Sequence, residues 1–146
     1  MKIRNMTIED YEALYRLWLN TQGMGLNTTD DSRTGIETYL RRNPKTCFVA
    51  DEAGELIGAI LAGHDGRRGY IYHLTVSEKH RGKKIGSALV EEAMTALERE
   101  GIHKVALVVF NRNEGGNTFW EKLGFQKRED LIYRNKNITE LIRIDT

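Results

Sequence analysis

Residues 74–88, with the sequence LTVSEKHRGKKIGSA, join an apolar strand pattern directly to an amphipathic helix pattern through a short basic turn that contains glycine. This arrangement places several backbone N–H groups and a helix N-terminus around one point, beside Arg81, Lys83 and Lys84. A helix N-terminus carries unpaired N–H donors and a partial positive charge. The segment therefore predicts a site for a phosphate-like anion. A solvated basic turn is the alternative interpretation.

Length and composition favour one domain, residues 1–146, that can bury a real core. The 146 residues are 40% hydrophobic and 29% charged, as in ordinary globular proteins. A net charge of +1 gives no global attraction to nucleic acid or to a membrane surface, so we expect neither as a partner. Cys47 is the only cysteine, and no signal-peptide or membrane-span pattern is present. These features predict a cytoplasmic protein without disulfides.

The first half of the chain predicts a strand, two helices and three further strands. Thr7, followed three residues later by Asp10, resembles a capping box that opens a helix over residues 8–20. A second helix is expected over residues 32–42. The hydrophobic patterns predict strands over residues 2–6, 46–51, 56–62 and 70–76.

The second half alternates strands with helices. An apolar stripe that begins at Ile85 predicts a helix that stops at Gly101. A strand over residues 104–109, a helix over 113–123 and two strands over 125–133 and 138–144 are expected to follow. The whole order predicts a mixed α/β (α+β) domain, with a central mixed sheet of six or seven strands flanked by about four helices.

Other chemistries that use a glycine-rich turn are not supported. The P-loop pattern G-x-x-x-x-G-K-[ST] fails because Gly86 is followed by Ser87 and Ala88, and no G-x-G-x-x-G pattern occurs. No G-x-S-x-G sequence supports a serine hydrolase. The four histidines are scattered without metal-ligand spacing, so we expect no metal site.

The run HRGKKIGSALV after the strand LTV resembles the acetyl-CoA-binding motif of the GCN5-related N-acetyltransferases, the GNAT family, with the pattern [RQ]-x-x-G-x-[GA]. Arg81 and Gly86 match its first and last positions, and Lys84 occupies the position that is normally glycine.

A later run, NRNEGGNTFWEKLGF, is similar to a second stretch of the same family, N-x-x-A-x-x-x-Y-x-x-x-G-F. Asn113, Gly124 and Phe125 match it, whereas Gly116 replaces alanine and Trp120 replaces the usual tyrosine. The order of predicted elements agrees with the family over essentially the whole chain.

The resemblance implies acetyl-CoA as co-substrate. Its pyrophosphate would lie on the backbone N–H groups of residues 82–87, and the backbone of residues 74–76 would pair with the pantetheine arm. A bulge in that strand would direct one N–H at the thioester carbonyl. The cofactor-binding residues so implied are Leu74, Thr75, Val76, Arg81, Gly82, Lys83, Lys84, Ile85, Gly86, Ser87, Asn113 and Trp120.

The backbone conformation at Lys84 determines how closely the N–H groups of residues 82–87 can approach the pyrophosphate. A left-handed conformation would cost lysine on the order of 1 kcal/mol relative to glycine. We expect a helical conformation instead, because Lys84 directly precedes the stripe that begins at Ile85, and its ammonium would then assist a phosphate. Asn113 is expected to contact the cofactor, to cap the following helix, or to do both.

The implied reaction is direct transfer of acetyl to an amine, but the acid and base are not obvious. Trp120 stands where many relatives have an acidic tyrosine, and its indole N–H is no useful acid, so we expect it to form a packing wall. Tyr133 is a candidate substitute. Tyr72 and His73 are candidate catalytic residues, and strand alternation lets only one of them face the acceptor. A structural histidine and a water relay are the alternatives.

The acceptor itself is not identified by the sequence. Asp30 and Asp31 could attract a cationic amine, although two acidic residues in a polar loop are more often solvated or near a helix N-terminus. The leading hypothesis is an N-acetyltransferase acting on a primary amine of a small molecule or peptide. The alternative is a non-catalytic acyl-CoA-binding sensor or regulatory module. The resemblance also makes a homodimer through the C-terminal strands plausible.

Overall fold

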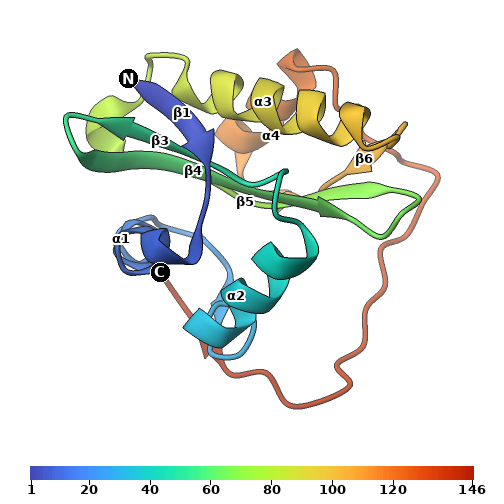
Figure 1. The fold of residues 1–146 in the computed structure, drawn as a ribbon. Helices are drawn as coiled ribbons and strands as arrows, with labels where there is room; N and C mark the ends of the chain where they lie inside the picture. Colours follow the sequence, from blue (N-terminus) through green and yellow to red (C-terminus); the bar gives the residue numbers. More distant parts are fainter.

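The computed structural model describes residues 1–146 and contains a five-stranded central sheet with helices on both faces (Figure 1). Its strands lie in the order β1-β3-β4-β5-β6; the first four are antiparallel and the last pair is parallel. The strands are β1 (Lys2–Asn5), β3 (Phe48–Glu52), β4 (Glu55–His64), β5 (Gly69–Val76) and β6 (Val105–Ala106). The mixed α/β fold class is therefore confirmed.

Two pairs of helices cover this sheet. In Figure 1, α3 (Ile85–Arg99) and α4 (Glu114–Lys122) lie on one face, and α1 (Tyr11–Leu19) and α2 (Arg33–Arg42) lie on the other. Single 3-10 turns, η1 (Ile8–Asp10) and η2 (Glu78–His80), precede α1 and α3. None of these helices is long and apolar enough to cross a membrane.

The alternation of side chains along the strands builds two cores. On β4, Ile60 and Ala62 join the cluster under α3, whereas Ala59 and Leu61 join the cluster under α1 and α2. Leu89 and Leu97 of α3 complete the first cluster. Because a strand with two buried faces has no polar side, β4 has the near-continuous apolar sequence that predicts it.

The predicted N-terminal half agrees closely with the structure. Thr7 opens η1 through a capping box in which its backbone N–H donates to Asp10 Oδ2 at 2.9 Å. The helix predicted over residues 8–20 consists of η1 followed directly by α1. Ser32 caps α2 by accepting a hydrogen bond from Gly35 N at 3.0 Å.

The C-terminal strands differ from the prediction. Residues 125–133 form no strand, and only β7 (Arg143–Ile144) forms in the last segment, where it pairs with β2 (Leu26–Asn27) in a separate two-stranded sheet. The central sheet therefore has five strands, and only the two sheets together contain seven. The physical reason is the short edge: β6 pairs with β5 over two residues and offers no longer backbone ladder to a following strand.

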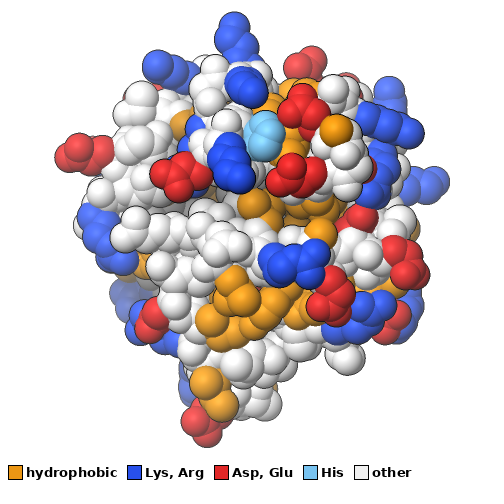
Figure 2. Space-filling view, turned by 90° about the vertical axis from the view of Figure 1, so that its left-hand side faces the viewer, with side chains coloured by type: hydrophobic (Ala, Val, Ile, Leu, Met, Phe, Trp, Pro, Cys, Tyr) orange, Lys and Arg blue, Asp and Glu red, His pale blue; other side chains and the backbone are white.

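Charge on the surface is mixed. On the face drawn in Figure 2, Lys and Arg side chains are interspersed with Asp and Glu, so this face carries no continuous basic surface. An anion that binds the protein must then be recognised by a local arrangement of donors.

Candidate active site

A cleft of about 1920 Å³ runs along β5. It begins at the turn before α3, passes between β5 and the segment after β6, and reaches α2 and the loop before it. The cleft exists because β6 leaves the sheet after Ala106: residues 107–111 line the opening instead of pairing with β5.

Nearly all of the residues predicted from the sequence line this one cleft. Of the cofactor-binding set, the cleft contains Leu74, Thr75, Val76, Arg81, Gly82, Lys84, Ile85, Gly86, Ser87, Asn113 and Trp120. Lys83 does not line it. The three candidate catalytic residues, Tyr72, His73 and Tyr133, line it as well. The fold thus brings two sequence motifs and the candidate catalytic groups to one place.

The turn before α3 presents its donors to the cleft. Lys84 is the N-cap of α3 and its side chain accepts no hydrogen bond from the first turn, so the leading N–H groups have no side-chain partner. Gly82 has φ of +80°, a conformation that glycine adopts without strain. Gly86 lets Phe119 of α4 approach, since an added Cβ would lie 3.3 Å from Phe119 Cζ.

The expected helical backbone at Lys84 is wrong. Lys84 has φ of +63° and ψ of +21°, which is the left-handed conformation. The first bond of α3, from Ala88 N to Lys84 O at 3.1 Å, uses the Lys84 carbonyl, but the residue itself turns the chain into the helix. The position that is normally glycine in the family thus has a left-handed backbone in this chain and is occupied by lysine, at a cost of roughly 1–2 kcal/mol.

The predicted bulge in β5 is present. Ile60 of β4 faces Leu74 and Ala62 faces Ile71, so Leu61 stands opposite both Tyr72 and His73. A bulge of this kind interrupts strict alternation. Tyr72 packs against Tyr39 of α2 and His73 against Trp18 of α1, with ring centroids 5.8 and 5.0 Å apart. The expectation that only one of Tyr72 and His73 can face the acceptor side is therefore wrong.

His73 belongs to a hydrogen-bonded pair. Its Nε2 lies 2.8 Å from Asp31 Oδ1, and the exposed fractions of the two side chains are 13% and 5%. Asp31 is fixed in turn, because Asn27 N donates to Oδ2 at 2.9 Å and Tyr11 Oη donates to the Asp31 carbonyl at 2.7 Å. A carboxylate that accepts from Nε2–H leaves the lone pair on Nδ1, so the pair can act as an oriented proton acceptor.

Asp31 is the residue that the sequence analysis undervalued. Of the two expectations for this acidic loop, solvation is wrong for Asp31, which is buried, whereas a place near a helix N-terminus is confirmed, because Asp31 directly precedes Ser32, the N-cap of α2. The sequence gives only a weak signal: an acidic residue directly before the helix-capping Ser32 looks like an ordinary N-terminal charge. Its partner lies 42 residues away, on the bulge of β5.

The tyrosines around the cleft have different surroundings. Tyr133 is 64% exposed and belongs to no strand. Burial raises the pKa of the Tyr72 hydroxyl, and the nearby Tyr133 and Asp30 raise it further. A raised pKa makes Tyr72 a weak acid, so its hydroxyl is a hydrogen-bond donor at neutral pH.

Asn113 and Trp120 hold the far wall of the cleft. Asn113 caps α4, with its Oδ1 accepting from Gly116 N at 2.9 Å, as predicted. A Cβ added at Gly116 would lie 2.5 Å from Asn113 Nδ2, so a larger residue at this position would require the Asn113 amide to shift. Trp120 packs edge-on against Phe119 and Phe125, each with centroids 5.1 Å away. This packing agrees with a wall and not with a proton donor.

No group of three or more His, Cys, Asp or Glu side chains is placed to hold a metal ion. The charged and polar groups that line the cleft include backbone N–H donors, the His73–Asp31 pair, hydroxyls and the cationic side chains of Arg42, Arg81 and Lys84.

Comparison with known proteins decides the family. The model of the acetyltransferase (GNAT) family matches residues 11–125, a span that includes the turn before α3, the β5 bulge and α4. The chain belongs to the GNAT acetyltransferase family. The resemblance drawn from the two sequence motifs is thereby confirmed.

Relatives of this GNAT chain carry acetyltransferase names. It is 31% identical over 140 residues to acetyltransferase SG1711 of Sodalis glossinidius, covering 96% of this chain and 97% of that protein. It is 32% identical over 142 residues to acetyltransferase plu1384 of Photorhabdus laumondii, covering 96% and 98%. The family and these names identify the chain as an acetyltransferase.

Solved structures share the fold of this GNAT chain. Ard1 from Thermoplasma volcanium matches with a TM-score of 0.75 and 23% identity, over 84% of this chain and 80% of that one. PaiA N-acetyltransferase from Thermoplasma acidophilum, in complex with coenzyme A, matches with a TM-score of 0.74 and 20% identity, over 97% and 96%.

Proposed function

We propose that this protein transfers an acetyl group from acetyl-CoA directly to a primary amine of a small molecule or peptide. The observation that supports the proposal is the single cleft, which joins the donor-rich turn before α3 to the bulge of β5 and to the His73–Asp31 pair. Each of these parts has a separate task in acyl transfer, and one molecule of acetyl-CoA laid along β5 would reach all of them.

The turn and the strand would hold the cofactor. The uncapped N–H groups at the start of α3, together with Gly82 and the Lys84 ammonium, suit the pyrophosphate. The backbone of Leu74, Thr75 and Val76 lies along the cleft and would pair with the pantetheine arm as an added strand would. Asn113 and Trp120 would close the opposite wall.

The bulge of β5 and the His73–Asp31 pair would carry out the acetyl-transfer step. The acceptor nitrogen attacks the thioester carbonyl, and a backbone N–H of the bulge stabilises the oxyanion that forms. His73 Nδ1 takes the proton from the nitrogen, while Asp31 holds Nε2. The carbon–sulfur bond then breaks and CoA leaves as a thiolate. Tyr72 and Tyr133, both at the cleft, are the hydroxyls able to donate a hydrogen bond to that sulfur.

A non-catalytic acyl-CoA-binding module is the second candidate. The observation that favours it is Trp120, which stands at the position of the family's acidic tyrosine and packs among aromatic rings. The two candidates differ in turnover, since both bind CoA. The oriented His73–Asp31 pair favours the enzyme, because a binding module needs no proton acceptor in the cleft.

The test is release of CoA from acetyl-CoA in the presence of polyamines, amino acids, aminoglycosides and N-terminal peptides. We expect release above background hydrolysis with at least one amine class, and acetylated amine in matching amount by mass spectrometry. Binding of acetyl-CoA without transfer to any of the acceptors would favour the module. Failure to bind acetyl-CoA would reject both candidates.

A further inference from the structure

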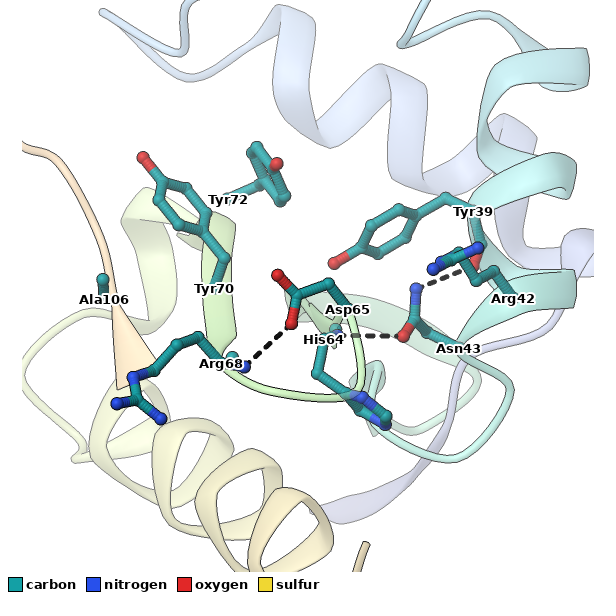
Figure 3. A pocket seen from close by; sticks show the side chains of 11 residues that line it. Tyr39, Arg42, Asn43, His64, Asp65, Arg68, Tyr70, Tyr72 and Ala106 are labelled. Atoms are coloured by element: carbon teal, nitrogen blue, oxygen red, sulfur yellow. Dashed lines mark hydrogen bonds between the residues drawn. The ribbon is translucent and has the colours of Figure 1, made fainter. Parts of the chain in front are cut away.

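A second cavity, of about 380 Å³, opens beside the cleft between the end of α2 and the β4–β5 hairpin (Figure 3). Tyr39, Arg42, Tyr70 and Tyr72 line both the cavity and the cleft. A molecule bound in the cleft can therefore extend into the cavity. The mechanism proposed above assigns the cavity no task.

Three tyrosine rings, those of Tyr39, Tyr70 and Tyr72, line the 380 Å³ cavity. Tyr39 and Tyr72 meet at 89° with centroids 5.8 Å apart, and Tyr70 and Tyr72 meet at 44° with centroids 4.6 Å apart. Burial raises the pKa of all three hydroxyls, so the rings are neutral phenols. Neutral aromatic faces attract cations through the ring quadrupole.

An exposed carboxylate, that of Asp65, also lines this cavity. Asp65 Oδ1 accepts hydrogen bonds from Arg67 N and Arg68 N, each at 2.8 Å, and these bonds hold the pKa of the carboxyl below its ordinary value. Its Oδ2 has no hydrogen-bond partner in the protein. In Figure 3 the Asp65 carboxylate points toward the space between Tyr39 and Tyr70. Tyr39 Oη, which is buried, has no hydrogen-bond partner either.

Two guanidinium groups also line the cavity and define the opposing hypothesis of an anion site. Figure 3 shows the Arg68 side chain turned away from the three rings, and its Nη1 donates to the Arg67 carbonyl at 3.1 Å. Arg42 comes from the last turn of α2, on the side of the cavity opposite Arg68. The two do not converge on one point as a carboxylate or phosphate clamp would.

We propose that the tyrosine cage, formed by Tyr39, Tyr70, Tyr72 and Asp65, binds a second cationic group of the acceptor. The acceptor is then an α,ω-diamine or a longer oligoamine, with one amine at His73 and another ammonium in the cage. This inference rests on the proposed transferase function. His73 follows Tyr70 by three positions on β5, which is about 10 Å in an extended strand, so we expect the two nitrogens to be spaced by roughly this distance.

The first experiment compares α,ω-diaminoalkanes of increasing chain length with alkyl monoamines of the same length, by CoA release. For the diamines, kcat/KM should rise with length until the nitrogens are about 10 Å apart, and should exceed that of the matched monoamine by roughly tenfold. Equal kcat/KM for diamines and monoamines at every length would overturn the proposal.

The second experiment uses variants. Asp65→Asn and Tyr70→Leu should raise KM for the preferred diamine roughly tenfold without changing KM for the monoamine, whereas Tyr70→Phe keeps the ring and should behave like the wild type. Asp130→Asn removes an exposed carboxylate outside both cavities and is the matched control. In Arg42→Ala and Arg68→Ala, KM for the diamine should be unchanged or lower than in the wild type. If KM for the diamine rises in these two variants and does not rise in Asp65→Asn, the cavity is an anion site instead.

Calorimetry separates failure of the cage from failure of the transferase. Titration of the α,ω-diaminoalkane whose nitrogens are about 10 Å apart into the CoA-bound protein should give binding that weakens in Asp65→Asn and not in Asp130→Asn. If no amine is acetylated but this difference is present, the transferase proposal fails and the cage stands. If amines are acetylated and the difference in binding is absent, the tyrosine-cage proposal is rejected and the transferase proposal is kept.

Discussion

His73 Nε2 and Asp31 Oδ1 lie 2.8 Å apart although 42 residues separate them in the sequence. The contact joins the bulge of β5 to the residue that precedes the cap of α2. It also ties β5 to α2, which carries Tyr39 and Arg42, so this side of the cleft is built from groups held to one another. Two features place His73 there: the bulge, which turns it toward α1, and the Trp18 ring against which it packs.

If this pair accepts the amine proton, its two members should differ in effect. His73→Ala should lower kcat by about a hundredfold or more with KM for acetyl-CoA unchanged, because general-base catalysis contributes that much. Asp31→Asn should lower kcat less and should alter the pH dependence of kcat, which a purely structural role would not do. Steady-state kinetics across pH measure both.

Glu52→Gln is the matched control for that experiment. Glu52 lies 3.4 Å from His80 in a second histidine–carboxylate pair, and neither residue lines the cleft. The variant should keep wild-type kcat and pH profile. Loss of activity in Glu52→Gln equal to that in Asp31→Asn would show that the effect comes from stability and not from catalysis.

Acid should weaken the fold through Asp10. Burial favours the neutral form of this carboxyl, but hydrogen bonds from Arg4 at 2.7 and 2.9 Å and from Thr7 N outweigh it, so the net pKa is lowered. A lowered folded-state pKa gives stability that is present above the unfolded value, near 3.9, and is lost as pH falls through the folded value. Asp10→Asn should therefore lose about 1 kcal/mol of unfolding free energy at pH 7, allowing for solvent around Arg4.

Urea unfolding at pH 7 and near pH 3 tests this linkage. The difference between wild type and Asp10→Asn should begin to shrink at the lower pH, because below about 3.9 the carboxyl of the unfolded wild-type chain takes up a proton before the folded one does. Asp145→Asn, which removes an exposed partner of Arg143, should leave the unfolding free energy unchanged at both pH values. A difference that stays constant with pH would contradict an ionic role for Asp10.

Features that depend on residues close together in the sequence could be predicted, whereas features that depend on contacts between distant segments could not. The caps at Thr7, Ser32 and Asn113 were predictable because each contact spans three residues. The bulge on β5 followed from the family resemblance, but its consequence for Tyr72 and His73 depends on strand register with β4, which is not local.

The C-terminal segment and Asp31 show why the rest could not be predicted. Residues 125–133 have a strand pattern, but a strand needs a neighbouring edge, and the sequence does not reveal that β6 ends at Ala106. Asp31 looks like a surface charge until the fold brings His73 to it. At Lys84 the neighbouring apolar stripe predicts a helical backbone, whereas the residue has a left-handed conformation that turns the chain.

The buried thiol of Cys47 should report on opening of the core. Burial raises the pKa of this thiol to about 12, and its S–H donates a hydrogen bond to the Ala62 carbonyl at 3.2 Å. Because the thiolate is the reactive form, alkylation by iodoacetamide at pH 8 should be very slow in the native protein and fast in urea. Stoichiometric labelling of the native protein within minutes, followed by mass spectrometry, would be inconsistent with this burial.

Lys84 combines a conformational cost with a charge, and two substitutions separate them. Lys84→Gly relieves the left-handed strain, offset by the larger entropy of the unfolded glycine, so the unfolding free energy should rise by less than about 1 kcal/mol. The same change removes the ammonium and should weaken CoA binding severalfold by calorimetry. Lys84→Glu should weaken it further, whereas Lys83→Glu, a neighbour that does not line the cleft, should not. Unchanged CoA affinity in Lys84→Glu would refute a phosphate contact and leave the backbone N–H groups of α3 as the anion donors.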